Sequence, residues 1–244
     1  MKIEITIPVL NEDATIDKKI RELDDYIDSN LTVLGDIKII IADNGSTDTT
    51  SVKAKLLEIE LARVEYIKLD EKGVGLALSS SWLKSTADII GYMDLDLATN
   101  LKHIQPALEV LISSNAEIVS GSRLKKGAIV IGRSRIRNFT SMMFNQIIRV
   151  VFNTSFSDGM CGFKFLQRRI LYNLICNGAK SKGWFFATEI LVIAESLKYR
   201  IYDLPVMWTD DPNSKVKIIN LTIEYLKHII RLKFLLLKKR LHLK

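Results

Sequence analysis

The feature that most constrains this chain is Asp94-Leu95-Asp96, which directly follows the apolar run Ile89–Met93. A short apolar run that ends in two carboxylates is typical of a buried strand that stops at the edge of a sheet. Side chains at positions i and i+2 of an extended chain point the same way, so both carboxylates can address one ion. Oxygen ligands of this kind suit Mg²⁺ or Mn²⁺. Two aspartates that only end a strand and face water would give the same pattern.

Two earlier segments end in the same way. Residues 3–9 alternate like a strand and lead into Asn11 and Glu12, and the apolar residues 37–42 lead into Asp43. Each of these polar groups alone could belong to a turn or a helix cap. Ligands of an open α/β sheet bind at the carboxyl ends of its strands, so we expect all these groups to share one site with Asp94 and Asp96.

The hydrophobic pattern predicts an α/β fold with a mainly parallel, Rossmann-like sheet that helices cover on both faces. At 244 residues the chain is long enough for one large domain with a substantial core. Cys161 and Cys176 lack metal-ligand spacing and are expected to be ordinary buried thiols in a reducing cytosol. We expect strands over 2–9, 36–42, 64–69, 89–94, 117–122, 160–166 and 201–208, and helices over 14–28, 48–60, 73–86, 101–114, 167–177 and 185–198.

The basic charge is concentrated at the carboxyl end. Lys and Arg exceed Asp and Glu by seven (35 minus 28), and residues 227–244 contain seven basic residues and no acid. Leucines and isoleucines lie between these charges, which predicts a basic amphipathic helix over 220–244. The helix could lie on a membrane surface through residues 221–244 or pack on the body of the protein. Nucleic-acid binding is not expected, since no aromatic platform accompanies the charges.

A second basic group lies in the middle of the chain. Arg123, Arg133 and Arg137 are the best candidates for binding a phosphate, because the planar guanidinium group can donate two hydrogen bonds at once. Residues 139–148 follow as an amphipathic helix with Met and Phe on its apolar side, a surface suited to a lipid chain. A solvated loop and a core helix would be the alternative.

With these segments in view, the chain resembles a family-2 glycosyltransferase with the GT-A fold, from about residue 3 to residue 217. The first half of the resemblance rests on residues 7–12 (Ile-Pro-Val-Leu-Asn-Glu), 42–48 (Ala-Asp-Asn-Gly-Ser-Thr-Asp), 72–77 (Lys-Gly-Val-Gly-Leu-Ala) and 93–96 (Met-Asp-Leu-Asp). Further motifs resemble dolichyl- and polyprenyl-phosphate glycosyltransferases, with the glucosyltransferase branch closest and the mannose synthases next. These are residues 119–123 (Val-Ser-Gly-Ser-Arg), 158–164 (Asp-Gly-Met-Cys-Gly-Phe-Lys), 184–189 (Trp-Phe-Phe-Ala-Thr-Glu), 204–208 (Leu-Pro-Val-Met-Trp) and 214–216 (Ser-Lys-Val).

The resemblance implies a metal-dependent, inverting transfer of one sugar from a nucleoside diphosphate sugar to polyprenyl or dolichyl phosphate. A uridine diphosphate hexose is the favoured donor and GDP-mannose the other possibility. Asp94 and Asp96 would hold Mg²⁺ or Mn²⁺. The residues expected to bind the nucleotide sugar are Pro8, Asn11, Glu12, Asp43, Lys72, Gly73, Asp94, Leu95 and Asp96, and those expected at the acceptor phosphate are Arg123, Arg133 and Arg137.

The resemblance also divides the chain into a nucleotide-sugar half (1–122), an acceptor half (123–219) and the tail helix (220–244). The protein would then act at the cytoplasmic face of a membrane, and no secretory signal is expected because the amino terminus opens into a strand. Asp158 and Glu189 are the candidate catalytic carboxylates of the acceptor half. Either could be a general base, and Asp158 could instead orient Arg123 or a sugar hydroxyl.

One departure from the pattern concerns the metal. Some polyprenyl-phosphate mannose synthases carry a polar residue two positions after the second aspartate, where this chain has Ala98. Water or substrate oxygens would have to take that place. The main alternative function is transfer to a sugar or protein hydroxyl, with Asp158 or Glu189 as base. A dehalogenase-type phosphatase, a nucleotidyltransferase and a non-catalytic protein of the same fold fit the order of the motifs less well.

Overall fold

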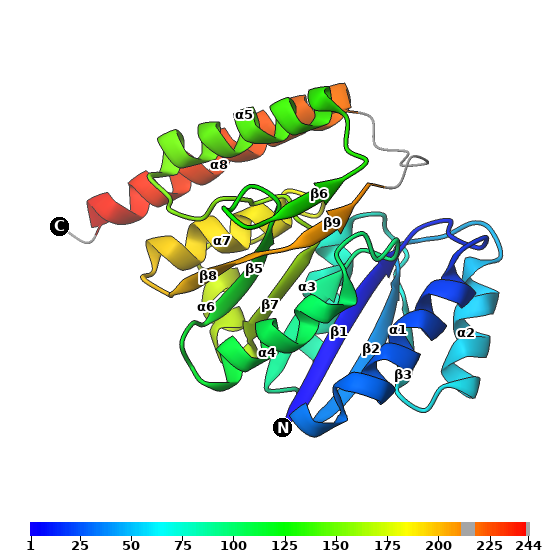
Figure 1. Ribbon diagram of the computed structural model, residues 1–244. Helices are drawn as coiled ribbons and strands as arrows, with labels where there is room; N and C mark the ends of the chain where they lie inside the picture. The colour runs from blue at the N-terminus through cyan, green and yellow to red at the C-terminus, as the bar shows by residue number, and fades with distance from the viewer. Residues whose placement is uncertain (211–217, 243–244) are drawn as a thin grey trace.

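The chain forms an α/β fold around a seven-stranded sheet, as shown by a computed structural model that describes residues 1–210 and 218–242 (Figure 1). The strand order is β3-β2-β1-β4-β7-β5-β8, and a small second sheet joins β6 to β9. All neighbouring strands of the large sheet run parallel except β7, which confirms the expected mainly parallel sheet. The strands are β1 (Lys2–Val9), β2 (Asp36–Asp43), β3 (Val64–Lys68), β4 (Ile89–Met93), β5 (Ile118–Ser122), β6 (Ile129–Ile131), β7 (Phe163–Gln167), β8 (Ile201–Pro205) and β9 (Met207–Thr209).

Helices cover both faces of this sheet, as the alternating pattern predicted. One core joins α1, α2 and α4 to the face that carries Ile3, Ile5 and Ile7, and the other joins α3, α6 and α7 to the face that carries Ile90 and Tyr92. Successive strand residues point to opposite faces, so strands buried on both sides are mostly apolar. The helices are α1 (Ile16–Asn30), α2 (Thr50–Glu60), α3 (Val74–Lys84), α4 (Ile104–Ile112), α5 (Arg135–Phe152), α6 (Leu171–Cys176), α7 (Phe186–Ser196) and α8 (Ile218–His242), with short 3₁₀ turns at Thr32–Leu34, Leu101–His103 and Arg168–Ile170.

The antiparallel strand β7 follows from the path of the chain. After β5 the chain leaves the sheet through β6 and α5, and it returns at the edge where β4 and β5 end. It therefore enters the sheet from the carboxyl end of β4, and Met93 of β4 pairs with Phe163 of β7. The returning segment 158–162 is thereby laid across the end of β4, next to Asp94.

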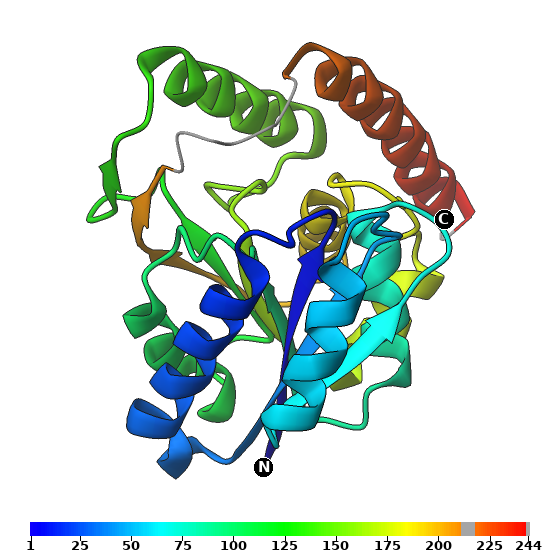
Figure 2. The same ribbon diagram turned by 90° about the vertical axis from the view of Figure 1, so that its right-hand side faces the viewer.

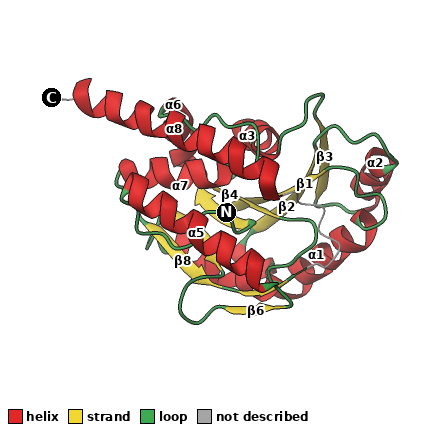
Figure 3. Cartoon of the chain, turned by 90° about the horizontal axis from the view of Figure 1, so that it is seen from above, coloured by secondary structure: helices red, strands yellow, loops and turns green. Residues whose placement is uncertain are grey.

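Helices α5 and α8 form the layer farthest from the central strands. Figures 1 and 2 show both helices above the sheet, and Figure 3 shows them side by side when the molecule is seen from above. Their contact includes the rings of Phe144 and Tyr225, whose centroids lie 5.2 Å apart. None of the described helices is both long and apolar enough to cross a membrane. The predicted motif at 214–216 and the end of the tail at 243–244 lie outside the described residues. Of the two cysteines expected to be buried, Cys161 is buried, but Cys176, the last residue of the short helix α6, is exposed.

Candidate active site

The turns after β1 and β2 are joined by hydrogen bonds. The Asn11 side chain accepts a hydrogen bond from the backbone N–H of Thr47 at 2.9 Å, and the Ser46 hydroxyl accepts one from the Asn11 N–H at 3.0 Å. The N–H of Glu12 donates to the Thr50 hydroxyl at 2.8 Å. Asn11 has a φ of 54°, a left-handed conformation that asparagine tolerates better than most residues. The structure therefore brings the first two predicted clusters together at one sheet edge.

Asp43 is fully buried at this edge, and both of its oxygens are engaged. Oδ1 accepts a hydrogen bond from the Ser46 N–H at 2.8 Å, and Oδ2 accepts one from the Tyr66 hydroxyl at 2.8 Å. Burial and the Asp43 carboxylate raise the pKa of Tyr66 well above its ordinary value, so the hydroxyl remains a donor. Pro8 lies beside this pair, opposite Ala42 in the β1–β2 register. The sequence reasoning did not identify Tyr66, which sets the direction of the Asp43 carboxylate.

The glycines at the start of α3 are explained by close packing. A Cβ atom on Gly75 would lie 2.2 Å from the Ser181 carbonyl oxygen, and one on Gly73 would lie 2.4 Å from that of Lys182. The Gly73 N–H donates to the Asn44 side chain at 2.6 Å. Lys72 is exposed at the entrance to this turn. These glycines thus let the loop at 181–183 approach α3, a reason that the sequence alone does not show.

Asp94 and Asp96 lie at the end of β4, in a cleft at the carboxyl edge of the sheet. Asp94 is covered by Gly162, because a Cβ atom on that glycine would fall 1.7 Å from Asp94 Oδ2. Asp94 Oδ1 is buried and has no hydrogen-bond partner, while Asp96 Oδ1 accepts a hydrogen bond from the Ala98 N–H at 2.9 Å. Burial and the neighbouring Asp96 carboxylate raise the pKa of Asp94 to about 7. The cleft is lined by Met93, Asp94, Asp96, Leu97, Ala98, Thr99, Gly162 and Trp208.

These groups fit a divalent cation. A buried carboxylate oxygen without a partner is costly, and a bound cation would satisfy it. Hard oxygen donors from Asp94 and Asp96 are the type that Mg²⁺ and Mn²⁺ take, with the other positions left to water and substrate. Within the described part of the chain, no cluster of three or more Asp, Glu, His or Cys side chains could hold a metal.

Asp158 forms a buried ion pair with Arg123, from the end of β5. Arg123 Nε donates to Asp158 Oδ2 at 2.7 Å and Arg123 Nη2 donates to Oδ1 at 3.0 Å, and the Met160 N–H adds a bond to Oδ1 at 3.0 Å. Burial alone would raise the pKa of Asp158, but the Arg123 charge and its hydrogen bonds outweigh that effect and hold the pKa well below its ordinary value. Both oxygens of Asp158 therefore bond to the Arg123 side chain and hold its guanidinium group in place.

Arg133 differs from the other two arginines predicted for a phosphate. Its Nη2 donates to the Ser141 hydroxyl at 2.7 Å, but Nε and Nη1 are buried without a partner. Burial and the nearby positive charge of Arg123 lower its pKa to about 10. Arg137, in contrast, donates to both oxygens of Asp210 at 3.0 Å. Arg133 thus holds donors that an anion could satisfy.

Trp208 joins the acidic and basic parts of the site. The guanidinium carbons of Arg123 and Arg133 lie 5.4 Å and 5.2 Å from the centre of its ring, distances at which a cation is attracted to an aromatic face. Trp208 also lines the cleft of Asp94 and Asp96. It stands at the end of the 204–208 motif, and that motif was the only sequence signal for it.

Lys164 is a buried cation that the sequence reasoning did not assign. Its Nζ donates to the carbonyl oxygen of Cys161 at 2.5 Å and lies 5.9 Å from the centre of the Tyr92 ring. Burial lowers its pKa. The lysine anchors the segment that carries Gly162 over Asp94.

Glu189 lies elsewhere, at the junction of α7 with α8. One oxygen accepts hydrogen bonds from the backbone N–H groups of Lys180 and Ser181 at 2.7 Å and 2.8 Å, and the other pairs with Arg231 of α8. The side chain is fully buried. These contacts make Glu189 a link between the tail helix and the loop that packs on α3.

Comparison with known proteins agrees with the motifs. A family model described as glycosyl transferase family 2 matches residues 4–175. Glycosyltransferase AglD of Haloferax volcanii is 27% identical over 220 residues, which cover 90% of this chain and 35% of that protein. Dolichyl-phosphate beta-glucosyltransferase ALG5C of Trichomonas vaginalis is 27% identical over 220 residues, which cover 87% of this chain and 65% of that protein. The chain therefore spans 35% and 65% of the lengths of these two relatives.

The fold is also that of a solved enzyme. Glucosyl-3-phosphoglycerate synthase from Mycobacterium tuberculosis, crystallised with Mn²⁺, UDP and glucosyl-3-phosphoglycerate, superposes with a TM-score of 0.62 at 16% sequence identity, covering 91% of this chain and 75% of that one. At this identity the likeness shows the fold alone. It confirms the predicted GT-A type architecture, and the sequence relatives confirm the resemblance to dolichyl-phosphate glycosyltransferases.

The ion pair of Arg123 and Asp158 should be essential to stability. Asp158→Asn leaves the Arg123 guanidinium buried without a counter-charge, and we expect a loss of about 3–5 kcal/mol in the free energy of unfolding, measured by urea titration. Glu71→Gln removes one partner of the exposed pair with Lys182 and should change little. A loss below about 1 kcal/mol in Asp158→Asn would show that the pair does not hold this region together.

Gly162 should be required for the arrangement of Asp94. In Gly162→Ala the new methyl group would displace the Asp94 carboxylate, and we expect Mn²⁺ affinity, measured by calorimetry, to fall at least about tenfold. Gly159→Ala is the matched control on the same segment, since its Cβ atom would lie 3.0 Å from the nearest side-chain atoms of Thr188. Equal affinities in the two variants would contradict the role given to Gly162.

Proposed function

Because this chain belongs to glycosyl transferase family 2, we propose that it moves one sugar from a nucleoside diphosphate sugar to polyprenyl or dolichyl phosphate. The observation that carries the acceptor class is Arg133, whose buried donors Nε and Nη1 lack partners beside the Trp208 ring. An acceptor phosphate would satisfy them. A relative that is named a dolichyl-phosphate beta-glucosyltransferase supports the same acceptor and a glucosyl donor. A uridine diphosphate hexose is the favoured donor, and GDP-mannose is the other possibility.

The donor would bind at the joined ends of β1, β2 and β4, within residues 1–122. Asn11, Glu12 and Asp43 would address the nucleoside, with Pro8 beside them, and Lys72 and Gly73 would lie near the diphosphate. Asp94 and Asp96 would hold Mg²⁺ or Mn²⁺, which would supply charge neutralisation for the departing diphosphate. The UDP and Mn²⁺ in the solved structure of the same fold support this type of donor.

The acceptor would bind within residues 123–219, across Trp208 from the two aspartates. Arg133 would hold the phosphate, while Arg123, fixed by Asp158, lies against the same Trp208 ring. One phosphate oxygen forms a bond to the anomeric carbon as the bond from that carbon to the diphosphate breaks, and the electron pair leaves with the nucleoside diphosphate. Attack from the face opposite the leaving group inverts the anomeric carbon.

Among the described residues, neither of the two carboxylates predicted as a general base is free, and this favours a phosphate acceptor. A sugar or protein hydroxyl would have to lose a proton to a carboxylate such as Asp158 or Glu189. Asp158 accepts hydrogen bonds on both oxygens and its pKa is held low by Arg123, and Glu189 is bonded to Lys180, Ser181 and Arg231. A phosphate is already anionic at neutral pH and needs no such base. These contacts favour the lipid phosphate over the hydroxyl acceptor.

The proposed acceptor is a membrane lipid, so the proposed location is the cytoplasmic face of a membrane. The basic helix within residues 221–244 would lie at the lipid surface. Its side chains beyond residue 238 are outside the described residues.

A transfer assay tests the proposed function. Labelled UDP-glucose or GDP-mannose is mixed with a short-chain polyprenyl phosphate, with Mn²⁺, Mg²⁺ or EDTA, and lipid-linked sugar is measured. We expect product from UDP-glucose that disappears with EDTA, and at least about a hundredfold loss of rate in Asp96→Asn. Asp36→Asn, at the exposed amino end of β2, should keep the wild-type rate. Transfer to a hydroxyl acceptor but to no lipid phosphate would contradict the proposal.

A further inference from the structure

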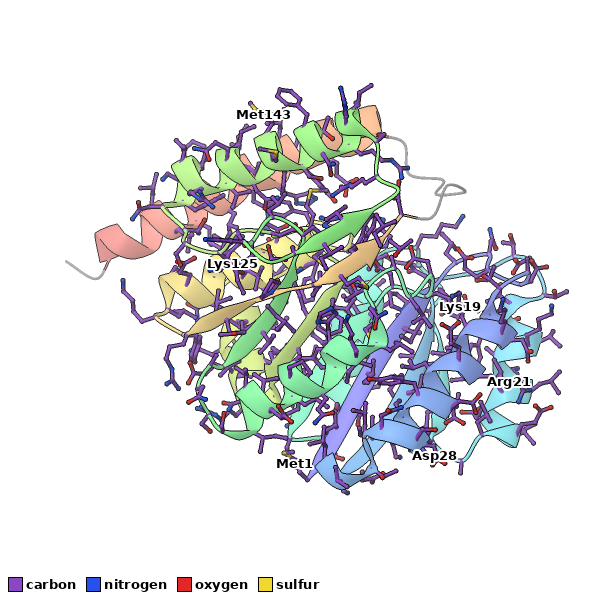
Figure 4. All side chains as sticks on the ribbon, viewed as in Figure 1. Met1, Lys19, Arg21, Asp28, Lys125 and Met143 are labelled. Atoms are coloured by element: carbon purple, nitrogen blue, oxygen red, sulfur yellow. The ribbon has the colours of Figure 1, made fainter. Side chains whose placement is uncertain are left out.

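Helix α5 buries polar residues and exposes apolar ones. Its buried side chains are Ser141, Asn145 and Ile148, whereas Ile136, Phe139 and Val150 are 72%, 63% and 71% exposed. Met142, Met143 and Ile147 are exposed as well. The spacing of three and four residues places most of these apolar residues on one stripe, on the opposite side of the helix from the buried residues. Figure 4 shows Met143 on the outer side of α5, away from the sheet.

Helix α8 carries a second exposed apolar stripe. Leu226, Ile230, Phe234 and Leu237 are exposed and recur every three or four residues. The same helix is fastened to the body on another side, where Tyr225, Ile229 and Leu232 are buried and Arg231 pairs with Glu189. The stripe is therefore not the side through which α8 packs on the protein.

The two stripes face the same way. On α5, Phe144 and Val151 make the contact with α8, through the Tyr225 ring and Lys233. On a helical projection Phe144 and Val151 lie between the buried side and the exposed stripe of α5. On α8, Tyr225 belongs to the buried side, and Lys233 lies between that side and the exposed stripe. Both stripes therefore point away from the body, and Figure 3 shows the two helices together on the near side of the molecule.

We propose that the exposed stripes of α5 and α8 form one surface that lies on an anionic lipid bilayer. A contiguous apolar surface of this kind marks an interaction site. Arg135 and Arg149 are exposed basic residues of α5, which has no acid, whereas Arg137 is paired with Asp210. Glu224 is the one acid in the sequence of α8. Apolar stripes beside basic side chains match the acyl chains and the negative head groups of a bilayer. A second copy of the chain would place like charges against each other, which disfavours pairing through this surface.

This surface deepens the proposed function, on which its connection to the acceptor rests. Arg133 immediately precedes the cap of α5 at Ser134, and its Nη2 is bound by Ser141 of the same helix. A lipid phosphate at Arg133 would thus lie at the amino-terminal end of α5, on its buried side, and the lipid chain would have to pass that end of the helix to reach the exposed stripe. Both α5 and the tail helix α8 would then contact the bilayer. Deleting the tail would also remove the buried residues Tyr225, Ile229 and Leu232, so point substitutions on α5 give the cleaner test.

The test is flotation of the full chain with vesicles of phosphatidylcholine and phosphatidylglycerol, without donor or acceptor. In the double variant Phe139→Glu and Met143→Glu, we expect vesicle affinity to fall at least about tenfold, with an unchanged melting temperature because both side chains are exposed. The matched control is Val33→Glu with Ile59→Glu, at positions that are 87% and 81% exposed on another part of the surface. The control should bind vesicles like the wild type.

Equal binding by the α5 variant and the wild type would overturn the inference, as would an equal loss in the control. The wild type could instead form a dimer that does not bind vesicles and that dissociates when the α5 substitutions are made. That result would assign the surface to a second copy of the chain. Failure of the transfer assay alongside α5-dependent flotation would refute the proposed acceptor and leave the bilayer surface standing. In the transfer assay, the α5 variant should retain activity on a water-soluble short-chain acceptor and lose it on a long-chain acceptor in vesicles.

Discussion

A buried ion pair between Arg123 and Asp158 fixes the two parts of the site relative to each other. It joins the end of β5 to the start of segment 158–162, which crosses the carboxyl edge of the sheet. That segment places Gly162 over Asp94, and the other partner of the pair, Arg123, lies against Trp208. A buried pair is stable only when its geometry is good and its remaining acceptors are satisfied, and both conditions hold here. Without this ion pair, the segment that covers Asp94 would not be fixed relative to Arg123 and Trp208.

The sequence was sufficient for much of the fold because the strands and helices carry strong local patterns. The isoleucines of β1 and β2 and the helical stripe of α1 are local signals, and they predicted a mainly parallel sheet with helices on both faces. Antiparallel β7 could not be predicted, because its direction depends on where the chain re-enters the sheet. The acidic strand ends at Asn11, Asp43 and Asp94 were predicted to gather, since parallel strands end at the same edge.

The parts of the site that sequence reasoning missed depend on contacts between distant residues. Gly162 is required by the carboxylate of Asp94, and Gly75 by a carbonyl of the loop at 181–183, so neither requirement is visible in its own segment. Likewise, Arg123, Arg133 and Arg137 look equivalent in sequence. Only their partners distinguish them. Asp158 neutralises Arg123 and Asp210 neutralises Arg137, while Arg133 retains unpaired donors. The apolar side of α5 was expected, but its outward direction required the structure.

The central claim is that a metal on Asp94 and Asp96 and a lipid phosphate on Arg133 share one site across Trp208. The most direct measurement is ³¹P relaxation of a short-chain polyprenyl phosphate in the presence of the protein and Mn²⁺. The account predicts strong paramagnetic broadening of the phosphate signal with the wild type, and its loss in Arg133→Ala, where Mn²⁺ still binds but the phosphate is not held. Broadening that persists unchanged in Arg133→Ala, or that never exceeds the level of Mn²⁺ alone, would contradict it.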